Sequence, residues 1–288
     1  MNEYKTAVDL RRALEARLKI DAENTGIDHM RLRRIVVFDR IAARLSVAEK
    51  EWVLKGGAAL EFRLGLRARA TKDLDLVLRS ELSDGATIRD VLIETLTFDV
   101  DRDRFVFTVG RPTELATDAA GNPGWRFPVD GALAGKTFIA VKMDIVLRPV
   151  ELAATERISL PGKLEFAGIR PRTIESADRR QHFAEKLHAL TRDYGLRPNT
   201  RVKDLVDLIL LIQDGLSPDE HLLAVVRHVF TVRATHQVPT GIPDPPPAWR
   251  DEYPAIAASA ELNEQDLPAA LDTLRAFWAQ AISTGATT

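Results

Sequence analysis

The feature that most constrains the fold is a stretch in which a glycine pair and two closely spaced aspartates flank an amphipathic segment. Gly56 and Gly57 follow the apolar run 52–54, and Asp73 and Asp75 open another apolar run. This order predicts a strand, a glycine turn, a helix and a second strand. Because side chains alternate along a strand, we expect Asp73 and Asp75 on the same side of it. Two carboxylates on one face repel each other unless a cation lies between them, and Mg²⁺ prefers such oxygen ligands.

A third carboxylate is expected beside this pair. The segment 136–147 alternates as a strand does, so that Asp144 falls on the face opposite Met143 and Ile145. Asp144 would join the aspartate pair if its strand neighbours theirs. The glycine pair opens a helix, whose free N–H groups suit an anion. Taken singly, paired glycines are often a plain turn and strand-start aspartates are often caps, but together they predict a divalent metal beside phosphate.

Composition excludes several classes of protein. The 288 residues include no cysteine, which rules out disulfides, thiolate metal sites and a cysteine nucleophile. The start of the chain is polar, and no apolar run approaches the roughly 20 residues of a membrane span. We therefore expect a cytoplasmic protein with no membrane partner. The net charge of −2 means that any nucleic-acid binding must come from a local basic face.

The remaining pattern predicts an α+β, α/β-like fold whose second half is mainly helical. Apolar residues recur at helical steps in 5–50, 84–96, 176–192, 200–213, 218–233, 251–260 and 267–282. Strand patterns occupy 104–109, 125–129 and 136–147, and 170–174 reads as an extended connector. The proline-rich segment 238–249 cannot be a helix or a central strand, and we expect an ordered surface loop there rather than a hinge.

Three charged residues in the helical half allow two interpretations each. Lys186 shares a predicted helix with apolar residues, and it is either a surface lysine or a point charge suited to triphosphate oxygens. Asp204 and Asp207 are three residues apart and therefore share a helix face. They are either an acidic surface pair or partners of Lys186 or of a bound substrate. Either aspartate could also help to activate an incoming hydroxyl, and the sequence does not choose between them.

Basic residues gather in two parts of the sequence. Arginines and lysines are frequent from Arg170 to Lys203, with fewer acids between them, and others flank the aspartate pair between Arg63 and Lys72. Such residues are either a solvated surface or, if they converge, a track for an RNA backbone.

The motifs together resemble those of AbiEii-type nucleotidyltransferase toxins, a family with tRNA-modifying members. The resemblance rests on four segments in the family's order: Leu54-Lys55-Gly56-Gly57-Ala58-Ala59-Leu60 with Arg69-Ala70-Thr71-Lys72-Asp73-Leu74-Asp75; Lys142-Met143-Asp144-Ile145; Phe183-Ala184-Glu185-Lys186-Leu187-His188-Ala189-Leu190; and Arg201-Val202-Lys203-Asp204-Leu205-Val206-Asp207-Leu208. Ala58 departs from the pattern, because a serine or threonine is common there. A hydroxyl contact to phosphate is therefore replaced by backbone N–H groups alone.

The resemblance implies a fold, an activity and a set of roles. It implies a nucleotidyltransferase-type mixed β-sheet with flanking helices, in which one or two Mg²⁺ ions are held by Asp73, Asp75 and Asp144. It further implies nucleoside triphosphate binding by Gly56, Gly57, Arg69, Thr71 and Lys186, with Asp204 and Asp207 at the catalytic site. The expected acceptor is the 3′ end of tRNA, whose blocking would stop translation, and the expected partner is a separately encoded antitoxin.

The expected domain organisation divides the chain near residue 150. Residues 1–150 would form the nucleotidyltransferase-like domain with its leading helices, and residues 151–288 a mainly helical domain that completes the active site. Two alternatives to the tRNA hypothesis remain. The acceptor could instead be a protein hydroxyl or a small molecule, or the chain could be a catalytically silent binding module.

Overall fold

The computed structural model describes residues 4–80, 82, 84–117, 121–147 and 151–284, and it divides the chain into two compact units. Unit 1 consists of Met1–Arg63, Ala70–Pro149 and Arg157–Ser176, and unit 2 of Leu64–Arg69, Val150–Glu156 and Ala177–Thr288. The predicted boundary at residue 150 falls outside the described residues. The division into domains 1–150 and 151–288 therefore stays a prediction.

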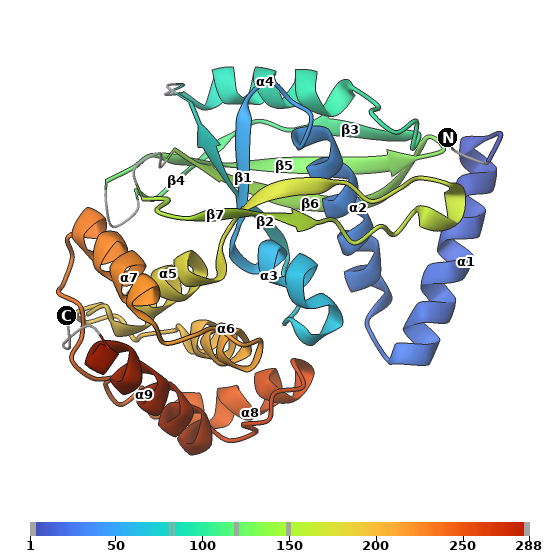
Figure 1. Cartoon of the computed structure of the whole chain (residues 1–288). Helices are drawn as coiled ribbons and strands as arrows, with labels where there is room; N and C mark the ends of the chain where they lie inside the picture. Colours follow the sequence, from blue (N-terminus) through green and yellow to red (C-terminus); the bar gives the residue numbers. More distant parts are fainter. Residues whose placement is uncertain (1–3, 81, 83, 118–120, 148–150, 285–288) are drawn as a thin grey trace. The chain divides into compact units, whose positions relative to one another are not determined.

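A mixed β-sheet organises unit 1 (Figure 1). Its strands, among the described residues, are β1 (Glu51–Lys55), β2 (Asp73–Arg79), β3 (Phe105–Val109), β4 (Thr113–Leu115), β5 (Gly124–Leu133), β6 (Lys136–Val146), β7 (Thr155–Ser159) and β8 (Thr173–Ala177). They follow the order β3-β5-β6-β2-β1-β8-β7, with β4 paired to β5. The central strand β2 is antiparallel to β1 and parallel to β6, whereas β5 and β6 form an antiparallel hairpin.

One face of this sheet is apolar and covered by helices. Phe127, Met143 and Leu74 are fully buried and lie beside one another across three strands. Helix α2 (His29–Leu45) packs against β6, and α4 (Gly85–Thr97) packs against β3 (Figure 1). Alternation along the strands then sends the intervening polar residues to the opposite face. The fold thus separates a covered apolar face from a polar one.

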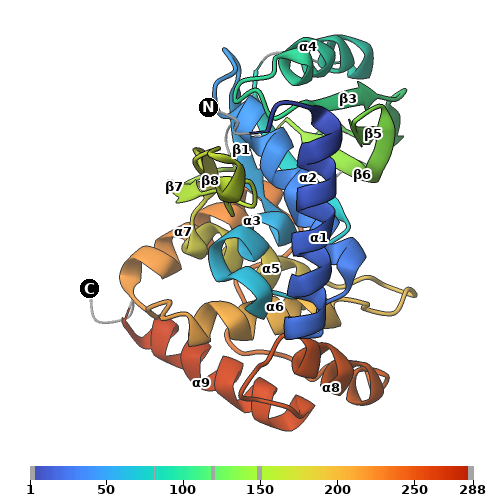
Figure 2. The ribbon, with the colours of Figure 1, turned by 90° about the vertical axis from the view of Figure 1, so that its right-hand side faces the viewer.

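Two leading helices form an antiparallel pair, as the sequence predicts for residues 5–50 (Figure 2). Helix α1 (Ala7–Thr25) ends at Gly26, whose φ of 68° is the left-handed conformation typical of a helix C-cap. Asp28 caps α2 by accepting a hydrogen bond from the Arg31 N–H. From α1, Arg11 donates to the carbonyls of Leu133 and Lys136, which fixes the β5–β6 turn.

Strands β7 and β8 extend the sheet beyond what the sequence predicts. The segment 170–174, expected to be a connector, leads into β8, which pairs in parallel with β1 through Leu54 and Ser176. Strand β7 was not predicted, because its sequence Thr-Glu-Arg-Ile-Ser has a single buried apolar residue, Ile158. Strand β7 forms because it pairs with β8 in the sheet, and not because its own sequence has a strand pattern.

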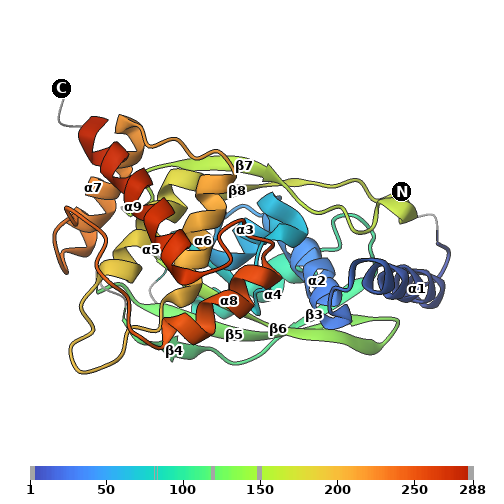
Figure 3. The same ribbon diagram turned by 90° about the horizontal axis from the view of Figure 1, so that it is seen from below.

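Unit 2 is helical, as predicted (Figure 3). Its helices in the described part are α5 (Arg179–Thr191), α6 (Val202–Gln213), α7 (Glu220–Arg233), α8 (Trp249–Ser259) and α9 (Leu267–Thr284). Helix α6 is buried over most of its surface and contacts α5, α8 and α9. The proline-rich segment is held in place by the indole N–H of Trp278, which donates to the Pro239 carbonyl at 2.9 Å. This contact agrees with an ordered loop.

The architecture confirms the predicted α+β class, with a mixed sheet, flanking helices and a helical second half. Among the helices that the structure describes, none has the length and apolar character needed to cross a bilayer.

Candidate active site

Three aspartates emerge on the polar face of the central strands of unit 1. Asp75 on β2 lies directly beside Asp144 on β6, because the two are partners in the parallel register. Asp73 lies two residues before Asp75 and therefore points to the same side. Their neighbours Leu74 and Met143 are fully buried on the other face. The structure thus places the three carboxylates that the sequence singles out on one face of the sheet, with Asp75 and Asp144 side by side.

The strand register continues this arrangement into a charged row across the sheet. Lys55 on β1 pairs with Asp75, Asp75 with Asp144, and Asp144 with Arg126 on β5. Register partners on neighbouring strands share a face. The two carboxylates at the centre of the row are therefore bracketed by a cation on each flanking strand.

Arg126 makes the strongest contact in this row. Its Nε donates to Asp144 Oδ1 at 2.7 Å and its Nη2 to Asp144 Oδ2 at 2.6 Å, a bidentate pair. The same Nη2 lies 3.7 Å from Asp73 Oδ2. The hydrogen bonds to Asp144, with the nearby charges of Asp73 and Asp75, raise the pKa of Arg126 above its ordinary value. The guanidinium is thus the cation between two of the three carboxylates.

The glycine turn lies against Asp75. Helix α3 (Gly56–Leu64) begins at Gly56, whose φ is 64°. A Cβ at that position would come 2.0 Å from Asp75 Oδ2, so a side chain there would displace the carboxylate. Gly57 is the second residue of the helix, and Ala58, which follows it, is fully buried. Gly56 is therefore required both by its left-handed backbone and by the close approach of Asp75.

Thr71 precedes the aspartate pair and fixes the entry of the chain into β2. Its hydroxyl donates to the Asp73 carbonyl at 3.3 Å, and its own carbonyl accepts from Arg34 at 3.1 Å. These contacts are to the backbone, and the side chain is nearly buried. The predicted nucleotide contact of Thr71 stays a prediction.

The carboxylates fit a divalent cation by their chemistry. Within the described residues, no three histidine, cysteine, aspartate or glutamate side chains are grouped closely enough to hold a metal ion. The three carboxylates nevertheless share one face, and carboxylate oxygens are ligands that Mg²⁺ accepts. The guanidinium of Arg126 already occupies the space between Asp144 and Asp73. Binding of a metal ion there would require Arg126 to release Asp144.

A second polar cluster lies within unit 2 and contains the other predicted site residues. Lys186 on α5 donates to Asp207 Oδ2 at 2.6 Å and to Asp204 Oδ1 at 3.2 Å, both on α6. Arg69 donates to both oxygens of Asp207, at 2.9 and 2.8 Å. Asp207 is 1% exposed and Lys186 is 8% exposed. The predicted pairing of Lys186 with the two aspartates is therefore present.

Burial and charge oppose each other in this cluster. Burial alone would raise the pKa of Asp207, but the charges of Lys186 and Arg69 outweigh it and hold that pKa below its ordinary value. Burial alone would lower the pKa of Lys186, but Asp207 and Asp204 outweigh it and raise that pKa. Lys186 and Asp207 are thus both charged at neutral pH. Because both oxygens of Asp207 are bonded, the geometry suits positioning better than proton transfer.

Sequence reasoning missed Arg126. The residue stands between Trp125 and Phe127, which are buried, in a strand that the sequence does predict. A polar residue that alternates with buried residues along a strand lies on the face opposite the core, and Asp144 lies on that same face. The missing step was the register of the hairpin, which decides that Arg126 and not another β5 residue lies beside Asp144.

The match to a protein family covers most of this chain. The family model described as "Nucleotidyl transferase AbiEii toxin, Type IV TA system" matches residues 40–280. No curated protein matches the chain. Among solved structures, the chain is similar to an antigenic nucleotidyltransferase-like protein from Paracoccidioides brasiliensis, at 17% identity and a TM-score of 0.40, covering 80% of this chain and 93% of that one. With a match over most of its length, the chain belongs to the AbiEii family of type IV toxin–antitoxin systems and is a nucleotidyltransferase.

Proposed function

We propose that the chain transfers a nucleoside monophosphate from a nucleoside triphosphate to the 3′ end of tRNA in a Mg²⁺-dependent reaction, and so blocks translation. The observation that carries the metal-dependent part is the side-by-side placement of Asp75 and Asp144, with Asp73 on the same face. The family supplies the reaction class. The choice of tRNA rests on the resemblance of the motifs to tRNA-modifying members.

The carboxylates have one role in this reaction. Asp73, Asp75 and Asp144 would hold one or two Mg²⁺ ions, which when bound neutralise phosphate charge and lower the pKa of the acceptor hydroxyl. The side chain of Asp73 is more exposed than that of Asp144, at 37% against 16%. Asp73 is therefore expected to contact solvent and ligand, while Asp144 remains close to the sheet.

The glycine turn and the unit 2 cluster have complementary roles. The absence of a side chain at Gly56 would let backbone N–H groups at the start of α3, including that of Gly57, approach the triphosphate. Lys186 would contribute a point charge to the triphosphate, and Arg69 would assist it. Asp207, which binds both cations, would hold them in position. Asp204 accepts from Lys186 at 3.2 Å and lies 3.8 Å from Arg201, so it is held less tightly than Asp207 and is the better placed of the two to activate the acceptor hydroxyl.

The transfer step itself is a substitution at phosphorus. The acceptor oxygen forms a bond to the α-phosphorus, the bond from that phosphorus to the bridging oxygen breaks, and pyrophosphate leaves. The hydroxyl proton passes to a carboxylate or to water. Catalysis of this kind depends on positioning and on neutralising charge rather than on a covalent intermediate.

A labelling experiment tests the proposal. Wild-type protein is incubated with each labelled nucleoside triphosphate, Mg²⁺ and total tRNA, and label on RNA is measured. We expect transfer by wild type and a loss of at least about 100-fold in Asp73→Asn and Asp144→Asn. Asp130→Asn is the matched control, because Asp130 is exposed and lies on β5 on the same face as Arg126. Full transfer by Asp144→Asn would contradict the proposal.

The same experiment separates the alternatives. Label that appears on protein or on an added small molecule, and not on RNA, would identify a different acceptor. Toxicity that survives the loss of all three carboxylates would indicate a binding module instead of an enzyme. An antitoxin is expected as the partner of a type IV system, and growth arrest on expression should be reversed when the neighbouring antitoxin gene is supplied.

A further inference from the structure

A polar hollow of about 790 Å³ lies in unit 1, away from the carboxylate face. Its wall comes from the turn that precedes β3 and from the segment that precedes β8. Three arginines line it, Arg102 from the turn and Arg170 and Arg172 from the second segment, against one aspartate, Asp101. The wall therefore carries a surplus of positive charge in a protein whose net charge is −2.

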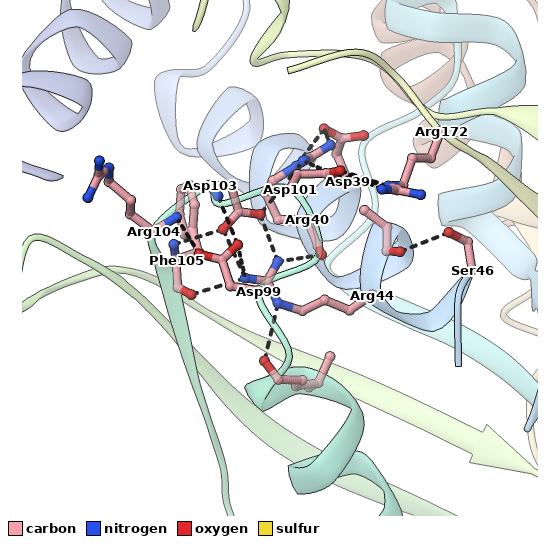
Figure 4. A network of polar contacts seen from close by, with 12 residues as sticks. Asp39, Arg40, Arg44, Ser46, Asp99, Asp101, Asp103, Arg104, Phe105 and Arg172 are labelled. Carbon is pink, nitrogen blue, oxygen red and sulfur yellow. Dashed lines mark hydrogen bonds and ion pairs between the residues drawn. The ribbon is translucent and has the colours of Figure 1, made fainter. Parts of the chain in front are cut away.

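The turn 99–104 contains three aspartates, at positions 99, 101 and 103, whose negative charges are compensated inside the protein. Figure 4 shows the aspartates of this turn gathered around Arg40 and Arg44 of α2, which are buried. Arg44 binds both oxygens of Asp103, at 2.7 and 2.8 Å, and Arg40 donates to Asp101 at 3.0 Å. The acidic groups of the turn are thus engaged by interior arginines.

Asp101 also holds one arginine of the wall in place. Arg172 donates to Asp101 Oδ1 through Nε at 2.9 Å and Nη2 at 2.6 Å. Burial alone would raise the pKa of Asp101, but Arg172 and Arg40 outweigh it and lower that pKa. Because Asp101 is bound by two arginines, it contributes little negative charge to the hollow, and Arg172 keeps a fixed orientation.

The backbone of the turn is strained in a way that presents Arg102 to solvent. Arg102 and Arg104 have φ values of 54° and 63°, the left-handed region that non-glycine residues seldom adopt. Such conformations persist where the surrounding contacts over-determine them, and they gather at binding sites. Here the inward ion pairs of Asp101 and Asp103 hold the turn, while the side chain of Arg102 is exposed.

The hollow is well separated from the aspartates. Phe105, which follows the turn, pairs with Leu133 at the end of β5, whereas Arg126 lies near the start of that strand. At about 3.3 Å per residue the two positions on β5 are roughly 23 Å apart. The turn, and Arg172 before the start of β8, thus lie towards the end of the strands away from Asp75, and a polynucleotide is long enough to reach both places.

We propose that this arginine-lined hollow binds backbone phosphates of the polynucleotide acceptor at a distance from its reacting end. The inference rests on the proposed function for the identity of the acceptor. Arginine is suited to the contact because its planar guanidinium binds phosphate oxygens in a bidentate manner. An acceptor held in this way is an RNA and not a small molecule, since only a chain of phosphates reaches both places.

Binding is tested on the full chain without nucleotide, by fluorescence anisotropy of labelled total tRNA over a range of salt concentrations. The variant Arg102→Glu/Arg170→Glu should bind at least about tenfold more weakly, and the slope of log K against log salt should fall by roughly 1.4 for two lost contacts. The control Lys50→Glu/Arg111→Glu makes the same change of charge at exposed positions outside the hollow. It should bind within about threefold of wild type.

A second variant covers the case in which charge reversal prevents folding. Arg102→Asn/Arg170→Gln removes both charges, and asparagine tolerates the left-handed backbone better than most residues. It should retain the wild-type melting temperature to within a few degrees and still lose affinity for tRNA. Equal affinity of this variant and wild type would overturn the proposal.

Three further outcomes are decisive. If inorganic phosphate binds as tightly as tRNA in calorimetry and the arginine variants weaken phosphate alone, the hollow is a small-anion site and the proposal is wrong. If the arginine variants bind tRNA normally while wild type still transfers label, this inference fails and the proposed function stands. If tRNA binding depends on the arginines but no label is transferred, this inference stands and the proposed function fails.

Discussion

The guanidinium of Arg126 and the carboxylate of Asp144 form a bidentate pair across neighbouring strands, with both nitrogen–oxygen distances below 2.8 Å. The pair is a direct result of the hairpin register, in which the two residues are partners. Arg126 also lies 3.7 Å from Asp73, so it compensates two carboxylates of the candidate metal site. A protein cation and a metal ion would therefore compete for the same oxygen ligands.

Replacing Arg126 by glutamine should strengthen metal binding. The change removes the competing cation and leaves the carboxylates uncompensated, which should raise the affinity for Mn²⁺ by about tenfold. Titration of Mn²⁺ followed by electron paramagnetic resonance measures the effect without any need for activity. Arg111→Gln, at an exposed position after β3, is the control. Unchanged or weaker Mn²⁺ binding by the Arg126 variant would show that Arg126 does not compete for this site.

Gly56→Ala should abolish transfer, whereas Gly26→Ala should not. Both glycines have positive φ, so each substitution costs about 1 kcal/mol of stability from the backbone alone. At Gly56 the new methyl group would also meet Asp75 Oδ2 at 2.0 Å, while at Gly26 nothing lies within 4 Å. Displacement of Asp75 should reduce transfer at least about 100-fold. Comparable activity in the two variants would contradict this reading of the turn.

Asp207→Asn should destabilise the protein more than Asp204→Asn. Asp207 is buried and binds two cations, so its neutralisation leaves Lys186 and Arg69 under-compensated, at a cost of roughly 3–5 kcal/mol. Asp204 makes one contact to Lys186 at 3.2 Å, and its loss should cost about 1 kcal/mol. Urea denaturation at neutral pH measures both values. Equal stability of the two variants would argue against a central role for Asp207.

The lowered pKa of Asp207 predicts how the stability of the folded protein changes at low pH. The pKa of Asp207 is lower in the folded protein than its unfolded value of about 3.9. Its contribution is therefore present above that unfolded value and is lost as the pH falls through the folded value. In urea denaturation below about pH 4, wild type should lose stability more steeply than Asp207→Asn. Parallel curves for the two proteins would show that another group causes the acid loss.

Arg44→Lys should be destabilising although it preserves charge. Arg44 binds both oxygens of Asp103 and the carbonyls of Leu96 and Phe105, all from a buried position. A lysine ammonium cannot reproduce this planar fork, so several acceptors would be left without donors, at a cost of roughly 2–4 kcal/mol. Arg12→Lys, at an exposed position on α1, should be neutral. A melting temperature unchanged by Arg44→Lys would contradict the prediction.

The sequence predicted the parts of the site that depend on local pattern. Alternation alone placed Asp73 and Asp75 on one face and Asp144 opposite Met143, and the structure has them so. The glycine turn at the start of a helix also follows from local chemistry. What alternation could not supply was which strands are neighbours, and that decides whether Asp75 and Asp144 lie side by side.

Long-range pairing also explains what the sequence missed. Arg126 depends on the register of the β5–β6 hairpin, strand β7 depends on its neighbour β8, and β8 pairs with β1, which lies more than 100 residues earlier in the chain. The arginines of α2 are a similar case, because a periodic pattern treats Arg40 and Arg44 as polar although both are fully buried. Asp39 beside Arg40 and the aspartates of the turn 99–104, about sixty residues later, compensate their buried charges.

The parallel pairing of β2 with β6 has a consequence for synthesis of the protein. Asp75 and its neighbour Asp144 are separated by about 70 residues of chain, so the carboxylate face cannot assemble until β6 has left the ribosome. Contacts of such large sequence separation also form late in folding, since the loop between them must first be closed. A partly synthesised chain therefore lacks the side-by-side carboxylates of Asp75 and Asp144.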